Sequence, residues 1–158
     1  MSTTVVPGGD EGRGGAGGAR RLTLTIAPTV QGLAEAQAQL SAFLQGAALP
    51  DKLVGRADLL LEEMMMNVIK HGHIADPAAA RVTLEAVTGP GVSCRLVFED
   101  PGAEFDPTKP TLPLAAARLE EAPVGGLGLV LLRRMARDLA YARLPEGRNR
   151  LTLTLTAE

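Results

Sequence analysis

The strongest constraint on the fold is a strict two-residue alternation of apolar and polar side chains near both ends of the chain. It appears in the segment LTLTI, residues 22–26, and returns in LTLTL, residues 151–155. Such alternation is typical of β-strands that are buried on one face only. We therefore expect a sheet with one face in the core and one face outside it.

The stretch that follows the first strand has the spacing of two helices. After Pro28, apolar residues recur at helical intervals as far as Gly46. A second, longer helix is predicted from Asp51, as its N-cap, to Gly72, as its stop. A third helix is predicted for residues 126–144, GLGLVLLRRMARDLAYARL.

The remaining pattern consists of a hairpin and a long connection. Residues 80–100 alternate on both sides of the turn Thr88-Gly89-Pro90-Gly91, which predicts two antiparallel strands. Residues 101–126 are proline-rich with little period, and a loop this long is usually functional or mobile. This order of elements indicates an α+β fold, a two-layer α/β sandwich with a mixed, mostly antiparallel sheet covered on one face by three helices.

Composition narrows the domain organisation and the function class. The 158 residues suit one domain, with residues 1–20 as a disordered, glycine-rich tail and residues 21–158 as the single domain. A formal net charge of -2 and 3% aromatic residues argue against direct nucleic-acid binding. Cys94 is the single cysteine, so an intrachain disulfide and a multi-cysteine metal site are excluded.

The sequence also gives an expectation about location. No apolar run reaches the ~18–20 residues that a bilayer requires. The N-terminus lacks a basic segment followed by an apolar one, the pattern of a secretory signal. Together with the lone cysteine, this predicts a cytoplasmic protein with no membrane contact.

The predicted second helix carries a polar line inside an apolar run. In LLLEEMMMNVIKHGH, Glu63, Asn67 and His71 are four residues apart and so lie on one face. An amide oxygen suits Mg²⁺ when phosphate and water complete its shell, and a carboxylate can orient or deprotonate a nucleophile. A solvated helix face, with a histidine near the negative end of the helix dipole, explains the same pattern.

Two glycine-containing segments follow. FEDPGAEFDP places Asp100 at a strand end and Gly102 in a turn, where the carboxylate could accept a hydrogen bond from an exocyclic amine; an ordinary Asp-Pro-Gly turn is the alternative. PVGGLGLVLL places Gly125, Gly126 and Gly128 before an apolar helix, which is a natural anion site. The segment lacks the P-loop pattern and the preceding strand of a dinucleotide fingerprint.

In this order, the segments resemble the ATP-binding domains of the superfamily that includes gyrase, heat-shock chaperones, histidine kinases and mismatch-repair proteins. EMMMNVIKHG is similar to its N box, DPGAEFDP to its first glycine box and GGLGLVLL to its second. The chain most resembles the small anti-sigma factor serine kinases of bacterial partner-switching systems. The first glycine box runs into EFDP, the ending GRNRLTLTL is similar to their terminal hairpin, and no dimerisation helices with a phosphoacceptor histidine are expected. The resemblance implies the Bergerat, histidine-kinase-like ATPase fold.

The resemblance also implies a role for each matching residue. Glu63 would be the general base on the attacking hydroxyl, and Asn67 would bind Mg²⁺ through its side-chain oxygen. Asp100 would bond the adenine amino group, and Gly102 would give the base room. The other implied nucleotide contacts are His71, Phe105, Gly125, Gly126, Leu127 and Gly128.

The segment between the two glycine boxes would form a lid over ATP. It runs from Thr108 to Val124, with Lys109 and Arg118 as its cations. Lys70 would also approach the nucleotide. On the third helix, the two arginines 133 and 134 are expected to face solvent.

The implied activity is phosphoryl transfer from ATP, with Mg²⁺, to a serine or threonine of an anti-sigma-factor antagonist with a STAS-type domain. The chain would also sequester a sigma factor from RNA polymerase, and a homodimer through the sheet or the first helix is compatible with the resemblance. Two alternatives remain open. One is a nucleotide-binding module that sequesters a partner without kinase activity, and the other is a detached histidine kinase catalytic domain acting in trans.

Overall fold

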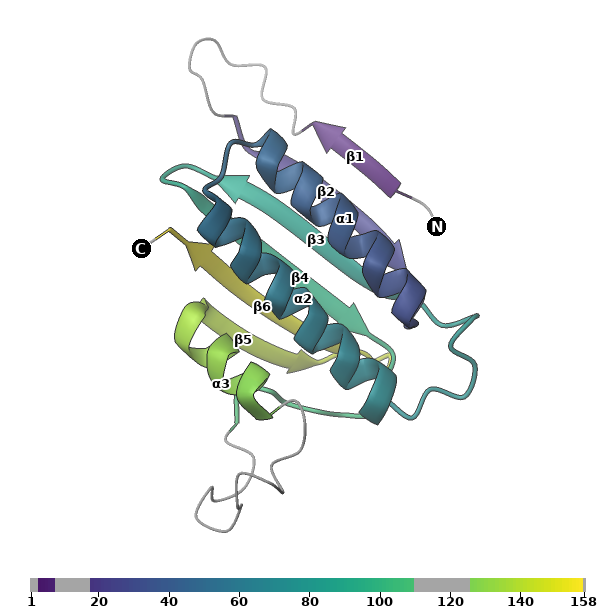
Figure 1. The fold of residues 1–158 in the computed structure, drawn as a ribbon. Coiled ribbons are helices and arrows are strands. Elements are labelled where there is room, and N and C mark those ends of the chain that lie inside the picture. Colours follow the sequence, from purple (N-terminus) through teal and green to yellow (C-terminus); the bar gives the residue numbers. More distant parts are fainter. Residues whose placement is uncertain (1–2, 8–17, 110–125, 158) are drawn as a thin grey trace.

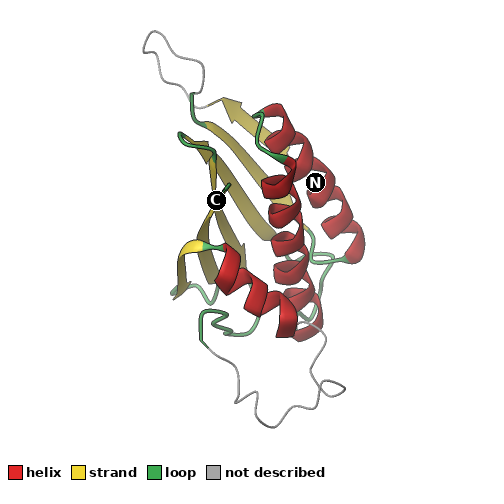
Figure 2. Ribbon diagram, turned by 60° about the vertical axis from the view of Figure 1, so that its left-hand side comes forward, coloured by secondary structure: helices red, strands yellow, loops and turns green. Residues whose placement is uncertain are grey.

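The computed structural model describes residues 3–7, 18–109 and 126–157. These residues form two layers, with the helices on one face of a six-stranded sheet (Figure 1, Figure 2), which confirms the expected α+β sandwich. None of the described helices is both long enough and apolar enough to cross a bilayer. The elements in chain order are β1 Thr3–Pro7, β2 Arg20–Ile26, α1 Val30–Gly46, α2 Asp51–His71, β3 Val82–Gly89, β4 Ser93–Asp100, α3 Gly126–Met135, β5 Arg137–Arg143 and β6 Asn149–Thr156.

The sheet has the strand order β1-β2-β3-β4-β6-β5, and every described pair of neighbours is antiparallel. The alternation in the sequence decides which side chains face the helices. Leu22 and Leu24 of β2, and Leu153 and Leu155 of β6, are at most 2% exposed. A slip of one residue would turn these leucines to the outer face, so their burial fixes the register.

Helix α2 lies in the middle of the helical layer and positions the site (Figure 1). Its side chains Leu60, Leu61 and Met65 are fully buried, which fixes one face of the helix on the sheet. Burying such a side chain stabilises the fold by roughly 1.5–3 kcal/mol. The helix ends at Gly72 as predicted, where the glycine N–H donates to the Val68 carbonyl at 2.9 Å.

The start of each long helix differs slightly from expectation. Helix α1 begins at Val30, because Thr29 caps it by accepting a hydrogen bond from the Gly32 N–H at 3.0 Å. The N-cap of α2 is Pro50 rather than Asp51, and no side chain caps the helix there. Asp51 is instead the first helical residue, where a carboxylate is favourable at the positive end of the dipole.

The predicted helix over residues 126–144 is wrong in its second half. Helix α3 ends at Met135, and residues 137–143 form strand β5, which pairs with β6. Leu139 and Tyr141, two residues apart, pack against the core from this strand. Alanines occupy the neighbouring positions and favour helix by propensity, so they concealed a two-residue period.

The segment expected to be a disordered tail, residues 1–20, contains a strand. β1 pairs antiparallel with β2, with Thr3 opposite Leu24. An open sheet edge presents unpaired backbone N–H and C=O groups, so a strand can add there without large apolar side chains. Residues 8–17 lie outside the described part of the chain.

Candidate functional site

A cavity of about 260 Å³ lies between the C-terminal half of α2, the loop after β4, and strands β5 and β6. Its lining is mainly apolar with a few convergent polar groups, which is the usual character of a small-molecule site. The apolar lining includes Met64, Val68, Phe98, Leu132 and Leu151, and the polar lining consists of Glu63, Asn67, His71, His73, Asp100, Glu104, Tyr141 and Asn149.

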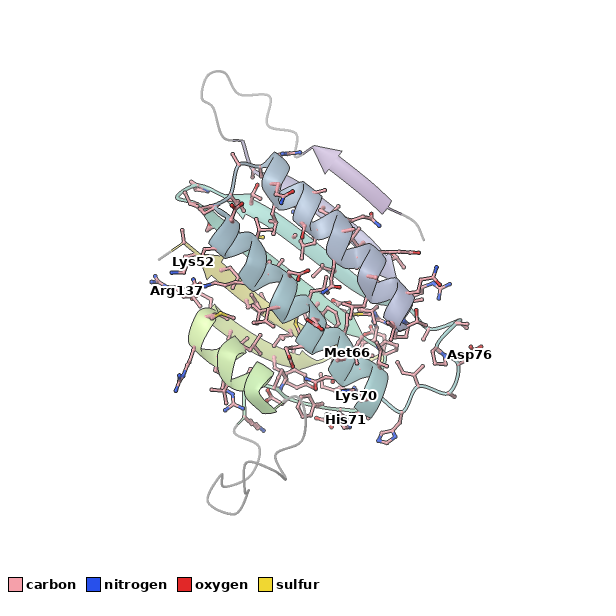
Figure 3. The ribbon with its side chains drawn as sticks, in the orientation of Figure 1. Lys52, Met66, Lys70, His71, Asp76 and Arg137 are labelled. Atoms are coloured by element: carbon pink, nitrogen blue, oxygen red, sulfur yellow. The ribbon has the colours of Figure 1, made fainter. Side chains whose placement is uncertain are left out.

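The polar line predicted on α2 faces this cavity. Glu63, Asn67 and His71 all line it, each one helical turn from the next. Met64 and Met65 lie between them in the sequence and are 6% and 0% exposed. Met65 therefore packs in the core, Met64 forms part of the cavity wall, and the polar residues of the same helix face the cavity. Figure 3 shows the imidazole of His71 at the C-terminal end of α2.

The surroundings of Glu63 raise the pKa of its carboxyl. Burial raises the pKa of its carboxyl above the ordinary 4.5, and the charge of Glu62 raises it further, while Lys70 lowers it. A carboxylate with a raised pKa is the stronger base of its kind, and it suits deprotonation of a hydroxyl better than a free one does.

Asp100 ends strand β4 and is 8% exposed. Its Oδ1 accepts hydrogen bonds from the Gly102 N–H at 2.8 Å and from Asn149 Nδ2 at 3.1 Å. A Cβ atom on Gly102 would lie 2.8 Å from that oxygen and 3.1 Å from the Cα of Gly72. Close packing of the loop on the carboxylate and on the end of α2 therefore explains the glycine, and its role in making room for a base stays a prediction.

Asn149 is a site residue that the sequence analysis missed. It is 6% exposed, opens strand β6 directly opposite Asp100 and lines the cavity. Its Nδ2 also donates to the carbonyl of Ala103 at 2.9 Å. The sequence GRNRLTL shows an asparagine at the start of a strictly alternating strand. Its partner Asp100 lies 49 residues earlier, so the spacing of residues in the sequence does not indicate the contact.

Two further residues of the site come from β5. The Tyr141 hydroxyl donates to Asn149 Oδ1 at 2.6 Å, and Arg143 Nη1 donates to the same oxygen at 3.0 Å. Arg143 Nη1 also donates to the Gly102 carbonyl at 2.8 Å. Residues two apart share a face on a strand but not on a helix. Because residues 137–143 are predicted to be helical, Tyr141 and Arg143 are not expected to face the same side.

The second glycine box lies only partly within the described residues. Gly126, Leu127 and Gly128 form the first turn of α3, where backbone N–H groups have no partner within the helix. An anion site at this turn stays a prediction. The end of α2 and the start of α3 lie at the same end of the molecule (Figure 1, Figure 2). Gly125, and the expected lid from residue 110 onward with its Arg118, lie outside the described residues.

The expectation that Arg133 faces solvent is wrong. Its side chain is half-buried and donates to the carbonyls of Pro107 at 3.4 Å and Lys109 at 3.2 Å. These contacts tie α3 to the start of the long connection, and they satisfy two carbonyls that have no strand partner. Arg134 is exposed, as expected. Phe105 lines the cavity and is 38% exposed.

The donors available for a metal are few. Within the residues that the structure describes, no group of three or more His, Cys, Asp and Glu side chains could hold an ion. Of the residues that line the cavity, Asn67 offers a metal its amide oxygen. One such ligand fits Mg²⁺, which usually takes one or two protein ligands and completes its octahedron with waters and phosphate oxygens.

Comparisons with known proteins identify the family of the chain. The family model of the histidine kinase-like ATPase domain matches residues 26–155. The serine/threonine-protein kinase BtrW of Bordetella bronchiseptica is 37% identical over 120 residues, which cover 71% of this chain and 80% of BtrW.

Two crystal structures share the fold. The RsbU and RsbW domains of Rv1364c from Mycobacterium tuberculosis match with a TM-score of 0.61 and 16% identity, over 86% of this chain and 32% of that one. The SiaB-SiaC complex from Pseudomonas aeruginosa matches with a TM-score of 0.57 and 17% identity, over 85% and 88%. The sequence resemblance is thereby confirmed, and the chain belongs to the histidine kinase-like ATPase domain family.

Proposed function

We propose that the chain is a protein serine/threonine kinase that phosphorylates an anti-sigma-factor antagonist and sequesters a sigma factor. The observation that carries this proposal is the convergence of Glu63, Asn67 and Asp100 on one cavity. The convergence occurs in a member of an ATPase family that is 37% identical to a serine/threonine-protein kinase.

The base of ATP occupies the end of the cavity at Asp100. Phe98 and Leu151, which are paired across β4 and β6, give this end an apolar lining for a flat ring. Asp100 then accepts a hydrogen bond from the exocyclic amine of adenine. When a base enters the cavity, the carboxylate of Asp100 exchanges water for contacts with the base. A base whose exocyclic amine donates a hydrogen bond to the carboxylate compensates for the lost water and is favoured.

The phosphates extend along α2 towards the start of α3. The backbone N–H groups of the first turn of α3 hold them, and Asn67 would bind Mg²⁺ through its amide oxygen. Bound Mg²⁺ would supply charge compensation for phosphoryl transfer. Glu63 orients the hydroxyl of the protein substrate and accepts its proton. His71, one turn beyond Asn67, adds a hydrogen-bonding group at the mouth of the cavity.

The partners follow from the resemblance of the sequence to partner-switching kinases. The phosphorylated partner is an antagonist with a STAS-type domain, and the sequestered partner is a sigma factor. Both act in the bacterial cytoplasm, which is therefore the proposed location. A homodimer through the sheet or through α1 belongs to the same proposal.

The deciding experiment incubates the chain and its antagonist with γ-³²P-labelled ATP and Mg²⁺. Glu63→Gln removes the base with little change in shape. Glu35→Gln on α1 is the control, because Glu35 is exposed and does not line the cavity. We expect acid-stable phosphoserine or phosphothreonine on the antagonist, reduced in Glu63→Gln and unchanged in Glu35→Gln.

The other outcomes separate the alternatives. Acid-labile phosphate on a partner histidine would identify a histidine kinase domain acting in trans. ATP binding without any phosphorylated partner would leave a nucleotide-dependent sequestering module. Equal activity of Glu63→Gln and wild type would exclude Glu63 as the base.

A further inference from the structure

The carboxylate of Asp100 is held by one oxygen only. Its Oδ1 accepts from the Gly102 N–H at 2.8 Å and from Asn149 Nδ2 at 3.1 Å. The hydrogen bonds of this carboxylate among the described residues all involve Oδ1 and leave Oδ2 without one. Among the same residues, no fully buried side-chain oxygen lacks a hydrogen-bond partner, so Oδ2 is not fully buried. Because Asp100 lines the cavity, Oδ2 is the oxygen that remains for a ligand.

The carboxamide of Asn149 can adopt only one orientation. Its Oδ1 faces three donors, namely Tyr141 Oη at 2.6 Å, Arg143 Nη1 at 3.0 Å and the Phe105 N–H at 3.4 Å. Its Nδ2 faces acceptors, which are Asp100 Oδ1 and the carbonyls of Gly102 and Ala103. A flipped amide would place N–H groups against N–H groups and oxygen against oxygen.

The donors and the acceptor of the Asn149 carboxamide are all engaged by protein groups, so none is left for a ligand. Asn149 can therefore influence a ligand only through the position of Asp100. We propose that Asn149, held by Tyr141 and Arg143, is a positioning residue that makes the cavity selective for a base with an exocyclic amine. Its N–H group fixes Oδ1 and aims Oδ2 into the cavity as an acceptor.

This selectivity follows from the chemistry of an ionised carboxylate, which only accepts hydrogen bonds. An amine at the same place donates to Oδ2. A carbonyl that displaced water from Oδ2 would set two acceptors against each other, and such a mismatch leaves polar groups unpaired. The inference rests on the proposed function in one respect, namely that the cavity takes a purine nucleotide.

Calorimetric binding of three nucleotides tests the inference. The nucleotides are ATP, purine riboside triphosphate, which has hydrogen in place of the amine, and inosine triphosphate, which has a carbonyl. For wild type we expect ATP to bind about tenfold more tightly than the unsubstituted purine, and inosine triphosphate to bind most weakly. In Asn149→Ala the preference for ATP over the unsubstituted purine falls to about threefold or less.

A second variant and a control show whether a changed nucleotide preference comes from the lost contact or from a loss of folded structure. Tyr141→Phe removes only the hydroxyl that holds Asn149, so its ATP preference falls between those of wild type and Asn149→Ala. Arg150→Ala is the control on the same strand, because its side chain is exposed and pairs with Glu99 instead of lining the cavity. If Asn149→Ala does not fold, as shown by circular dichroism, the Tyr141→Phe ratio decides alone.

The outcomes distinguish this inference from the proposed function. A wild type that binds none of the three nucleotides refutes both. A wild type that binds ATP and the unsubstituted purine equally refutes the inference and leaves the kinase intact. Unchanged ratios in Asn149→Ala, or in Tyr141→Phe when the first variant is unfolded, also refute it.

Discussion

Gly72, the C-cap of α2, lies directly against Gly102 in the loop after β4. The Ala103 N–H donates to the Gly72 carbonyl at 3.0 Å, and a Cβ atom on Gly102 would lie 3.1 Å from the Gly72 Cα. This backbone contact sets the distance between α2, which carries Glu63 and Asn67, and the loop that follows Asp100. The two halves of the site are therefore joined by a contact that a single methyl group would obstruct.

Gly102→Ala should thus damage the site directly. The added Cβ would lie 2.8 Å from Asp100 Oδ1, so either the carboxylate or the loop must move. We expect ATP binding to weaken at least tenfold and stability to fall by about 1–3 kcal/mol. Calorimetry and thermal unfolding measure both. Gly55→Ala is the control, because a Cβ at Gly55 meets nothing within 4 Å, and normal ATP binding by Gly102→Ala would contradict the argument.

Glu63→Gln should separate binding from chemistry. The amide keeps the shape of the side chain but cannot accept the hydroxyl proton, so phosphoryl transfer should fall by ~10²–10⁴-fold. ATP affinity should change less than threefold, because the base acts on the protein substrate rather than on the nucleotide. Single-turnover transfer and calorimetric binding give the two numbers. A parallel loss of affinity and rate would assign Glu63 to nucleotide binding.

The same carboxyl should make stability depend on pH. Burial raises the pKa of Glu63 in the folded state above 4.5, so folding favours the protonated form. That contribution is complete below 4.5 and is lost as the pH rises through the folded-state pKa. The free energy of unfolding of Glu63→Gln, minus that of wild type, should therefore be larger at neutral pH than in acid. Thermal unfolding at both pH values tests this prediction. An equal difference at both pH values, as expected for the exposed Glu35→Gln, would contradict it.

Strands β2, β3, β4 and β6 and the polar line on α2 could be predicted because their signals are local. Leu22 to Ile26 alternate every two residues, and Glu63, Asn67 and His71 recur every four. Each pattern matches the geometry of one element, and no distant contact is needed to interpret it. Burial then follows in the structure from the same periods.

Strand β5 and the residues around Asp100 could not be predicted in this way. Ala140 and Ala142 have high helix propensity, and tertiary pairing with β6 overrides it. The role of Asn149 depends on Asp100, with which it is paired across the neighbouring strands β6 and β4. In the sequence, Asp100 has the pattern of a turn residue, and Asn149 has that of the first residue of a strand.

Two glycines in helices should respond oppositely to alanine. Gly55 is exposed on α2 with open space at its Cβ position, so Gly55→Ala should stabilise the fold by about 0.5–1 kcal/mol through helix propensity. A Cβ at Gly32 of α1 would lie 2.1 Å from the Ala27 carbonyl oxygen, so Gly32→Ala should destabilise it. Urea unfolding of both variants makes the comparison. A shift of the same sign in both would show that these contacts do not decide the outcome.

Cys94 should react with alkylating reagents only when the whole domain unfolds. It is 0% exposed in β4, whose backbone pairs with β3 on one side and β6 on the other, so fraying of an edge strand does not expose it. Burial also raises the pKa of its thiol to about 12, so almost no thiolate forms at pH 8. Iodoacetamide labelling should therefore be negligible in buffer and should rise along the urea unfolding curve.

The matched control is Val92→Cys in a Cys94→Ala background, because Val92 is 42% exposed in the hairpin turn. That cysteine should label rapidly without urea. If Cys94 labels as fast as the control, β4 opens locally, and the sheet beneath the cavity is not the rigid support for Asp100 that the site requires.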